Sequence, residues 1–446
     1  MKKVLLIGAG KSSGYLIDYL LKYAVAENYE LTVADLSMES ALLKTKGLPN
    51  SNAIVLDINN EAERFNQIQH ADIVISMLPA FMHFPVAKDC VDLKKHLVTA
   101  SYVSPEIMSL NDKALEHDVL LLNEIGLDPG IDHLSAMKVI HEIQHQGGKL
   151  NSFKSFCGGL VAPESNDNPW GYKFSWNPRN VILAGQSTAQ FLIEGEYKFL
   201  PYHRLFASIE VIEVDGYGKF DAYANRDSLS YRKAYGIEDI KTMVRGTLRQ
   251  HLYCEAWHVF VILGLTDDSI QIEFPKNYTY ADFMASFLPG NGNDLMQRLC
   301  AFTNKSEDDV IIKMIEWTGL LNNELIEVQK GSPAMVLQKL LEKKWALEPK
   351  DKDMVVMQHL FELTASNNSN KKISSTLVVI GDDNQKTAMA KTVGLPLAMA
   401  VRRLIKGDIK LRGVQIPVMP EIYEPILNEL AEYGITFVEK EESQIK

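Results

Sequence analysis

The segment Val4-Leu5-Leu6-Ile7-Gly8-Ala9-Gly10-Lys11-Ser12-Ser13-Gly14 opens the chain with an apolar run, two glycines and the start of a helical pattern. A short apolar run bounded by glycine predicts a buried strand. Gly8 permits the tight turn after that strand, and Gly10 lets a phosphate approach the backbone. The helix then presents free N–H groups and its positive dipole end to the phosphate. The segment therefore predicts a strand–turn–helix unit that binds a dinucleotide.

The context of this motif matters, because its glycine spacing is unusual. The third glycine, Gly14, falls one position late, and Ser13 takes its place in the G-x-G-x-x-G pattern. Five more apolar runs follow, separated by helical stretches, at residues 31–33, 53–56, 72–76, 96–99 and 119–122. Such alternation predicts a parallel sheet with right-handed crossovers. We expect a Rossmann domain over residues 1–130.

Two acidic residues follow the second and third predicted strands. Asp35 lies 27 residues after Gly8, near the position where a carboxylate binds the ribose hydroxyls. Asp57 follows the next strand and can meet the adenine amine. A carboxylate at residue 35 would repel a 2′-phosphate and no arginine follows it, so we expect NAD rather than NADP. The expected cofactor-binding residues are Gly8, Gly10, Lys11, Ser12, Ser13, Asp35, Asp57, Leu78 and Pro79.

The chain changes character after residue 130. Aromatic and β-branched segments interrupted by Gly, Pro and Asn predict a mixed or antiparallel sheet. The fold class is therefore α/β, with a Rossmann parallel-sheet domain and a mixed-sheet α+β domain for substrate binding and dimerisation. We expect this second domain over residues 131–280 and 344–386, with a helical insertion at 281–343. Residues 387–446 are expected to dock back on the Rossmann domain.

The composition describes a sizeable globular chain without a basic field. Its 446 residues, at about 150 per domain, predict two or three domains. Lys and Arg number 46 against 57 Asp and Glu, so the net charge of −11 argues against nucleic acid and anionic membranes as partners. The longest apolar stretches, such as residues 259–265, fall short of the roughly 20 residues of a membrane helix. We expect a soluble, cytoplasmic protein.

Metal sites and disulfides are not predicted. The four cysteines are scattered without a C-x-x-C pair, which argues against a zinc ribbon and against a disulfide scaffold. His141, Glu142 and His145 form the H-E-x-x-H pattern of zinc hydrolases. We expect both histidines to face solvent, without a third ligand, because the helix has its apolar face opposite them. That face comprises Ala136, Val139, Ile140 and Ile143.

Polar loops follow the fifth and sixth predicted strands. The first reads Ser101-Tyr102-Val103-Ser104-Pro105, and the second contains G-L-D-P-G-I-D-H at residues 126–133. Ligands of open α/β sheets bind past the carboxyl ends of the strands, where both loops lie. Four more motifs follow along the chain: C-G-G-L at 157–160, N-P-W-G-Y-K-F-S-W at 168–176, N-R-D-S at 225–228 and R-G-T-L-R at 245–249.

With these motifs in this order and approximate spacing, the sequence resembles the saccharopine dehydrogenases that form L-glutamate. The resemblance runs from residue 1 to at least 265. It implies an oxidoreductase of lysine metabolism that oxidises the secondary amine of L-saccharopine with NAD or NADP. The imine is then hydrolysed to L-glutamate and L-2-aminoadipate 6-semialdehyde. A homodimer is also implied, for which the mixed sheet offers a surface. Members associated with NADP carry an arginine after the second strand, where this chain has Asp35-Leu36.

The resemblance implies which residues bind the substrate. It indicates Ser101, Tyr102, Asp128, Pro129, Arg226, Gly246, Thr247 and Leu248 as substrate-binding residues, and places Cys157 near the reacting centre. Saccharopine carries three carboxylates and two amines, so its pocket needs fixed cations, and Arg226 and Arg245 have guanidinium groups that match carboxylates. Asp128 can pair with an amine. Tyr102 can donate to a carboxylate or orient the water that attacks the imine.

Asp128, Cys157 and Tyr102 are the catalytic candidates, and several questions stay open. The proton acceptor is Asp128, Cys157 or a second substrate amine. His83 lies over the nicotinamide or caps a helix. Related dehydrogenases act on other carbon–nitrogen bonds, as in carboxynorspermidine formation or lysine 6-oxidation. A dinucleotide-binding regulator without turnover is the alternative from another class, although such a protein has no need of a tricarboxylate pocket.

Overall fold

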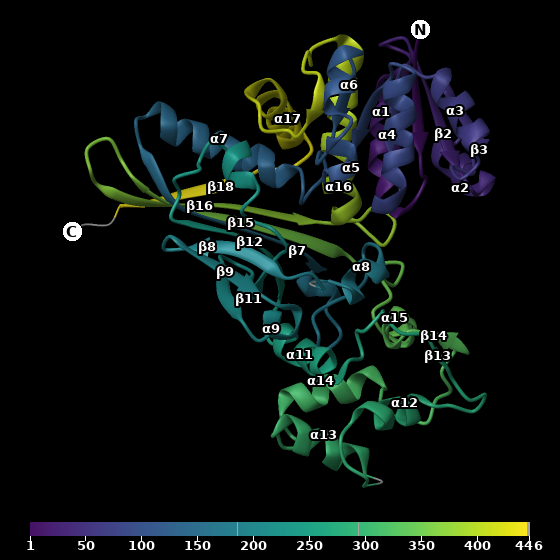
Figure 1. Ribbon diagram of the computed structural model, residues 1–446, viewed down its shortest axis with the longest axis vertical. Coiled ribbons are helices and arrows are strands. Elements are labelled where there is room, and N and C mark those ends of the chain that lie inside the picture. Colours follow the sequence, from purple (N-terminus) through teal and green to yellow (C-terminus); the bar gives the residue numbers. More distant parts are fainter. Residues whose placement is uncertain (185, 293, 444–446) are drawn as a thin grey trace. The chain divides into compact units, whose positions relative to one another are not determined.

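The computed structural model describes residues 1–184, 186–292 and 294–443, which gather into two compact units (Figure 1). The first unit comprises Met1–Lys149, Ala365–Ser369 and Leu377–Val438. The second comprises Leu150–Thr364, Asn370–Thr376 and the chain from Glu439 onward. Among the described residues, no helix combines the length and apolar character that a bilayer span requires.

A parallel sheet of seven strands organises the first unit, in the order β17-β6-β5-β4-β1-β2-β3. All of its pairings are parallel. Strands β1 to β6 have the order 3-2-1-4-5-6 of a Rossmann domain, which confirms the predicted fold class. The strands are β1 (Lys2–Ile7), β2 (Tyr29–Asp35), β3 (Ser51–Val55), β4 (Ile73–Ser76), β5 (His96–Thr99), β6 (Leu120–Leu122) and β17 (Gly413–Gln415).

Helices connect these strands and bury their apolar stripes. They are η1 (Lys11–Ser13), α1 (Gly14–Ala24), α2 (Met38–Thr45), α3 (Glu61–Gln69), η2 (Ala80–Met82), α4 (His83–Asp92), α5 (Pro105–Met108), α6 (Asn111–Glu116), α7 (Ile131–His145), α16 (Ala388–Lys406) and α17 (Pro420–Glu432). Helix α16 packs closely on α1, because a Cβ at Gly394 would lie only 3.0 Å from the backbone nitrogen of Leu16. The first unit therefore includes much of the C-terminal segment.

The first unit also extends past residue 130, the boundary that we expected. Helix α7 packs on α17 there, and the His141 Nδ1 lies 2.8 Å from the Tyr423 hydroxyl. His141 is therefore half-buried in a helix contact, whereas His145 is exposed as expected. Within the described residues, no group of three metal-ligating side chains is found.

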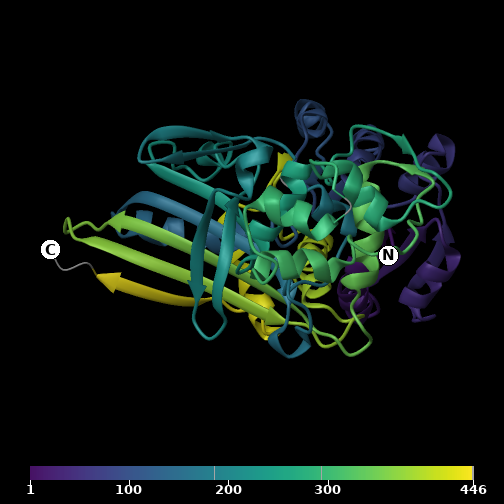
Figure 2. The same cartoon turned by 90° about the horizontal axis from the view of Figure 1, so that it is seen from below.

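A mixed sheet forms the second unit, as expected, in the order β10-β11-β12-β7-β15-β16-β18, with the β8–β9 hairpin attached to β12. Strands β12 and β7 are parallel, whereas β11 is antiparallel to both of its neighbours, β10 and β12. Figure 2 shows β15, β16 and β18 as long neighbouring strands. The strands of this sheet are β7 (Lys149–Val161), β8 (Ala189–Ile193), β9 (Glu196–Leu200), β10 (Ile209–Val214), β11 (Gly218–Ala224), β12 (Thr242–Gln250), β15 (Asp353–Thr364), β16 (Asn370–Ile380) and β18 (Val438–Ser443). Strands β13 (Ile272–Glu273) and β14 (Lys330–Gly331) pair with each other in a separate two-stranded sheet.

A large aromatic core holds the helices of the second unit. Trp170, Trp257 and Trp345 are fully buried together, with ring centroids 5.4–6.2 Å apart. The motif at residues 168–176 belongs to this core but forms no strand, because its backbone turns rather than extends. The remaining elements are η3 (Pro163–Ser165), α8 (Pro178–Ile182), α9 (Tyr202–Leu205), α10 (Tyr231–Ala234), α11 (Tyr253–Leu263), α12 (Tyr280–Phe287), α13 (Leu295–Thr303), α14 (Val310–Thr318) and α15 (Pro333–Lys344).

Candidate active site

The glycine loop after β1 is shaped to admit a phosphate group. Gly8 has a φ of +105°, and a Cβ there would lie 2.9 Å from the carbonyl oxygen of Met77. A Cβ at Gly10 would meet no atom within 4 Å, so the loop is open above that residue. Lys11 and Ser12 then begin η1, whose first-turn N–H groups lack helical acceptors. This arrangement fits the pyrophosphate of a dinucleotide.

The other cofactor candidates lie around the same loop. Leu78 and Pro79 directly follow Met77, at the end of β4, so the close approach of Gly8 brings them beside the glycine turn. Ser13 donates its hydroxyl hydrogen to the carbonyl oxygen of Gly10 at 2.8 Å, which closes the turn from within. The nine candidates therefore lie in this turn and at the ends of β2, β3 and β4.

Asp35 ends β2, and its carboxylate is held by the backbone. One oxygen accepts from the Ala9 N–H at 2.7 Å and the other accepts from the Ser37 N–H at 3.0 Å. These contacts fix the carboxylate beside the glycine loop, where a ribose would lie. Asp57 lies two residues after the end of β3, is exposed, and accepts from the Asn59 N–H at 2.9 Å.

Buried polar contacts lock the G-L-D-P-G-I-D-H loop into one conformation. Glu124 accepts from the Val103 N–H at 3.0 Å with one oxygen and lies 2.8 Å from His133 Nε2 with the other. Asp132 accepts from the Gly130 N–H at 2.5 Å. Gly130 has a φ of +148°, and a Cβ there would lie 2.0 Å from the carbonyl oxygen of Gly126. Sequence reasoning did not single out Glu124, which lies two residues before the motif, or assign a role to His133 within it.

This loop presents Asp128 next to Tyr102. The Tyr102 hydroxyl donates to the Asp128 carboxylate at 3.4 Å, a long hydrogen bond, and both side chains are half-buried. Pro129 follows through a cis peptide bond. The structure thus brings together two of the three catalytic candidates in the first unit, and Ser101 is the neighbour of Tyr102 in the chain.

Ser101 ends a chain of buried side chains. The ring of His83, which is 1% exposed, lies with Nδ1 2.8 Å from Ser76 Oγ and with Nε2 2.6 Å from Ser101 Oγ. Burial lowers the pKa of His83 to about 4, so the imidazole is neutral at physiological pH. His83 is also the first residue of α4, but it makes no side-chain cap there.

The second unit holds the other candidates on two adjacent strands. Thr247 of β12 pairs with Cys157 of β7, so these two side chains and that of Arg245 share one face of the sheet. Gly246 lies on the opposite face, where a Cβ would be 2.7 Å from the Phe156 ring. Leu248 shares that face and is fully buried. The observed contacts of Gly246 and Leu248 are therefore packing contacts.

Backbone hydrogen bonds tie the two arginine motifs together. The Asn225 N–H donates to the Arg245 carbonyl oxygen at 2.8 Å, and the Arg245 N–H donates to the buried Ser228 Oγ at 2.8 Å. The guanidinium of Arg245 lies over the Tyr231 ring, 4.3 Å from its centroid. Arg226 is exposed, and its carbonyl oxygen accepts from the Gln190 N–H at 2.7 Å. The structure thus brings Arg226 and Arg245 onto neighbouring backbone segments.

Arg249 of the R-G-T-L-R motif and Lys173 of the N-P-W-G-Y-K-F-S-W motif are buried in the second unit. Arg249 is 3% exposed and lies within 5.8 Å of the centroids of three tyrosine rings. Lys173 is also 3% exposed and pairs with Asp167 at 2.8 Å and Asp351 at 2.7 Å. Both cations thus have partners within the protein: tyrosine rings for Arg249 and carboxylates for Lys173.

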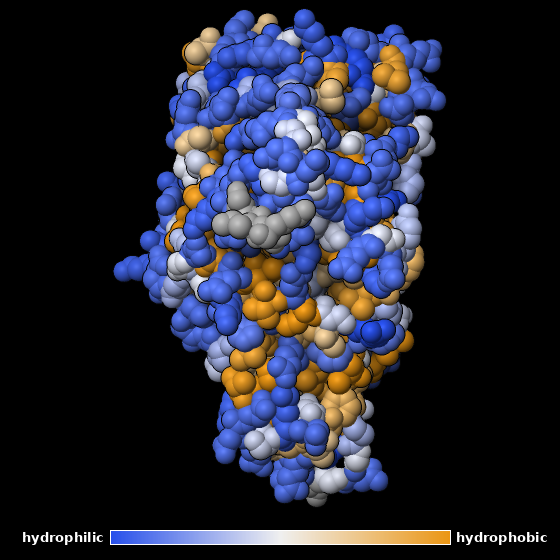
Figure 3. Space-filling model, turned by 90° about the vertical axis from the view of Figure 1, so that its left-hand side faces the viewer, coloured by the Kyte–Doolittle hydropathy of each residue, from blue (hydrophilic) through white to orange (hydrophobic). Residues whose placement is uncertain are grey.

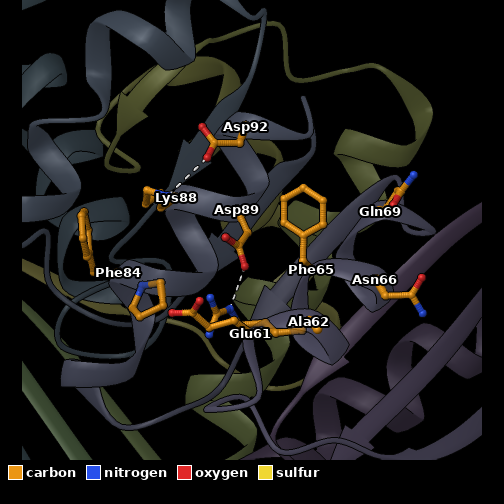
Figure 4. Close-up of a pocket in the computed structure, with 11 residues that line it drawn as sticks. Glu61, Ala62, Phe65, Asn66, Gln69, Phe84, Lys88, Asp89 and Asp92 are labelled. Carbon is orange, nitrogen blue, oxygen red and sulfur yellow. Dashed lines mark hydrogen bonds and ion pairs between the residues drawn. The ribbon is translucent and has the colours of Figure 1, made fainter.

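A separate hollow lies between α3 and α4 in the first unit (Figure 4). Arg64 and Asp89 form a buried ion pair at 2.7 Å in its wall, and Phe65 and Phe84 line it as well. None of the predicted site residues lines this hollow. It is therefore distinct from the loops at the carboxyl ends of the strands.

Family models match nearly the whole chain. The saccharopine dehydrogenase NADP binding domain matches residues 4–122, and the saccharopine dehydrogenase C-terminal domain matches residues 126–435. The chain belongs to the saccharopine dehydrogenase family. The saccharopine dehydrogenase (NADP(+), L-glutamate-forming) of Pyricularia oryzae is 35% identical, over 98% of this chain and 99% of its own length. This membership confirms the predicted family and identifies the chain as an oxidoreductase.

Two further relatives define how the chain relates to larger proteins and to solved structures. The apo saccharopine dehydrogenase (L-Glu forming) of Saccharomyces cerevisiae has a TM-score of 0.89 at 34% identity, over 99% of this chain and 100% of that one. The alpha-aminoadipic semialdehyde synthase of Rattus norvegicus is 34% identical over 98% of this chain, which covers 47% of that protein. The saccharopine dehydrogenase fold thus occurs alone and within longer chains.

The comparisons bear on the cofactor as well. They support a nicotinamide dinucleotide as the cofactor of this saccharopine dehydrogenase family member, as predicted. They do not support our preference for NAD, because the family domain and the fungal relatives are named for NADP. The structural feature that bears on the choice between NAD and NADP is the Asp35 carboxylate, which accepts from the Ala9 and Ser37 N–H groups.

Proposed function

We propose that this chain oxidises L-saccharopine at its secondary amine. The carbon bonded to this nitrogen gives up a hydride and the nitrogen gives up a proton, which leaves an imine. Water then hydrolyses the imine to L-glutamate and L-2-aminoadipate 6-semialdehyde. The bound nicotinamide supplies the hydride acceptor. The observation that carries the proposal is the full-length similarity to L-glutamate-forming saccharopine dehydrogenases, together with the Tyr102–Asp128 pair at the carboxyl edge of the sheet.

Each candidate residue has a role that its chemistry supports. We assign Arg226 and Arg245 to substrate carboxylates, because guanidinium groups bind carboxylates through paired hydrogen bonds. Ser101, Pro129, Thr247 and the backbone of Gly246 and Leu248 are assigned to the same substrate. Asp128 pairs with the positive charge that develops on the reacting nitrogen, and Tyr102 orients the attacking water. Cys157 remains the alternative proton acceptor.

A panel of amines tests the substrate. Purified chain with either cofactor is offered L-saccharopine, carboxynorspermidine or L-lysine, and the absorbance of the reduced nicotinamide is followed. Turnover of saccharopine alone supports the proposal. Faster turnover of either other amine would make the chain a related carbon–nitrogen dehydrogenase, and cofactor binding without any turnover would favour the regulator.

We further propose that Asp35 makes this chain prefer NAD, although its fungal relatives are named for NADP. The fixed carboxylate lies where it can accept from both ribose hydroxyls and would repel a 2′-phosphate. We expect kcat/KM to be at least about tenfold higher with NAD than with NADP. Asp35→Asn keeps one of the two oxygens that accept from the Ala9 and Ser37 N–H groups and removes the charge, so it should reduce this ratio at least about tenfold.

The matched control for the cofactor experiment is Glu39→Gln. Glu39 is an exposed acid in the first turn of α2, and its substitution should leave the NAD-to-NADP ratio unchanged. A wild-type chain that turns over only with NADP would overturn the preference and leave the substrate assignment in place. An unchanged ratio in Asp35→Asn would show that residue 35 does not decide it.

We also propose that the chain acts as a homodimer in the cytoplasm. Exposed apolar residues on the β9 and β10 strands support a protein contact: Tyr197, Phe199, Ile209 and Val211. Figure 3 shows that hydrophobic residues gather on the face that it presents. The four cysteines form no disulfide, which suits a reducing compartment.

Sedimentation equilibrium tests the dimer, and we expect a particle of two chains. Phe199→Glu places a charge on an apolar surface and should shift the particle toward one chain. Ile270→Glu, at another exposed apolar residue of the second unit, should leave the two-chain particle intact. A single chain in the wild type would contradict the proposal.

A further inference from the structure

Three side chains connect the interior of the first unit with the Ser101 loop. Ser76 lies at the end of β4, His83 at the start of α4 and Ser101 just after β5. The His83 ring lies between the two hydroxyls, 2.8 Å from Ser76 Oγ and 2.6 Å from Ser101 Oγ. Ser76 and His83 are each 1% exposed, whereas Ser101 is half-buried. The chain of hydrogen bonds therefore runs from the core to the loop.

The buried hydrogen bond between Ser76 and His83 decides which nitrogen of the His83 ring carries the hydrogen. Among the described residues, the Ser76 hydroxyl has one recorded partner, the Nδ1 atom of His83. A buried hydroxyl that lacks an acceptor is costly, so Ser76 donates its hydrogen to Nδ1. A neutral imidazole has one donor and one acceptor nitrogen. His83 therefore carries its hydrogen on Nε2 and donates it to Ser101.

Burial keeps the His83 ring neutral, so one of its nitrogens donates and the other accepts. The pKa of His83 is lowered to about 4 because the buried ring loses its hydration. No charged partner is recorded for this ring within the described part of the chain. At the pH of an ordinary assay the ring is therefore a fixed dipole with a defined tautomer.

The hydrogen bond from His83 Nε2 restricts where the hydroxyl hydrogen of Ser101 can point. Because Ser101 Oγ accepts from His83, its own hydrogen must point to another acceptor. The described residues offer no recorded acceptor for that hydrogen. A carboxylate accepts hydrogen bonds and does not donate them. We propose that His83 is a positioning residue that sets the Ser101 hydroxyl as a donor to a carboxylate of the substrate.

This inference rests on the proposed function, since it supplies a ligand for one of the carboxylates of saccharopine. Loss of a hydrogen bond to a charged group typically lowers affinity about 10- to 100-fold. His83→Ala should therefore raise the KM for saccharopine by about that factor. The kcat at saturating saccharopine and the KM for the cofactor should stay within about threefold of wild type.

Two amide variants distinguish positioning from simple packing. The amide nitrogen of His83→Gln can reach the place of Nε2 and donate to Ser101, so the KM should recover toward wild type. The shorter His83→Asn can meet Ser76 but stops short of Ser101, so its KM should stay as high as that of His83→Ala. Equal KM values for the Gln and Asn variants would overturn the proposal. Thermal melting of each variant identifies those that do not fold.

A double-mutant cycle with Ser101→Ala gives the sharper test. If His83 acts through Ser101, His83→Ala adds nothing to the KM of Ser101→Ala. Multiplied KM effects in the double variant would overturn the proposal. Ser109→Ala, an exposed serine beyond the same loop, is the control that should leave KM unchanged. A wild-type chain inactive on saccharopine would instead refute the proposed function, so the two failures are distinguishable.

Discussion

Replacing Asp128 with asparagine is expected to lower kcat for saccharopine oxidation by about 100-fold or more. Positive charge develops on the reacting nitrogen as the hydride leaves, and a carboxylate beside it stabilises that charge. A carboxylate can also accept the amine proton. Asparagine has the same shape and keeps an oxygen for the Tyr102 hydroxyl, which lies 3.4 Å away. The loop should therefore keep its conformation while the charge is lost, and steady-state kinetics with saccharopine measure the effect.

Two further variants separate the possible roles of Asp128. Cys157→Ser removes the thiol of the alternative proton acceptor. If Asp128 is the proton acceptor, the kcat of the Cys157→Ser variant should stay within about tenfold of wild type. Asp112→Asn changes an exposed carboxylate on α6 and should leave kcat unaltered. A kcat of Asp128→Asn within a few-fold of wild type would contradict the catalytic assignment.

Gly130→Ala is expected to destabilise the first unit by about 3 kcal/mol or more. The new Cβ would lie 2.0 Å from the carbonyl oxygen and 2.2 Å from the nitrogen of Gly126, which belong to backbone rather than to a flexible side chain. The φ of +148° is also one that alanine rarely adopts. The loop that presents Asp128 must therefore open or shift.

Denaturant titration and saccharopine turnover measure this effect together. Gly292→Ala is the matched control, because a Cβ there would meet no atom within 4 Å and should change stability by less than about 0.5 kcal/mol. A Gly130→Ala chain with wild-type stability and activity would show that the loop does not need its observed conformation. Lost activity at preserved stability would show that only the loop has moved.

Local patterns in the sequence predict most of the first unit. Apolar runs alternating with helical stretches predict a parallel sheet, because the central strands of such a sheet are buried on both faces and parallel neighbours need a crossover connection, usually a helix. The glycine turn, Asp35 and the G-L-D-P-G-I-D-H loop are found where the strands end. The strand order adds β17 at one edge, which only the folded chain shows.

Local sequence patterns do not predict contacts between segments that are distant in the chain. His83 meets Ser76 and Ser101 only because the sheet places the ends of β4 and β5 side by side. The two carboxylate partners of Lys173 come from residues 6 and 178 positions away in the chain. Helix α7 belongs to the first unit because of its packing on α17, which no periodicity within α7 reveals.

The amount of L-glutamate formed per reduced nicotinamide tests the central proposal most directly. Purified chain is incubated with L-saccharopine and either cofactor, and both products are measured in the same sample. We expect one L-glutamate for each nicotinamide reduced, because hydride leaves the carbon that becomes the semialdehyde. Reduction that yields lysine and 2-oxoglutarate in place of L-glutamate, or no reduction with either cofactor, would contradict it.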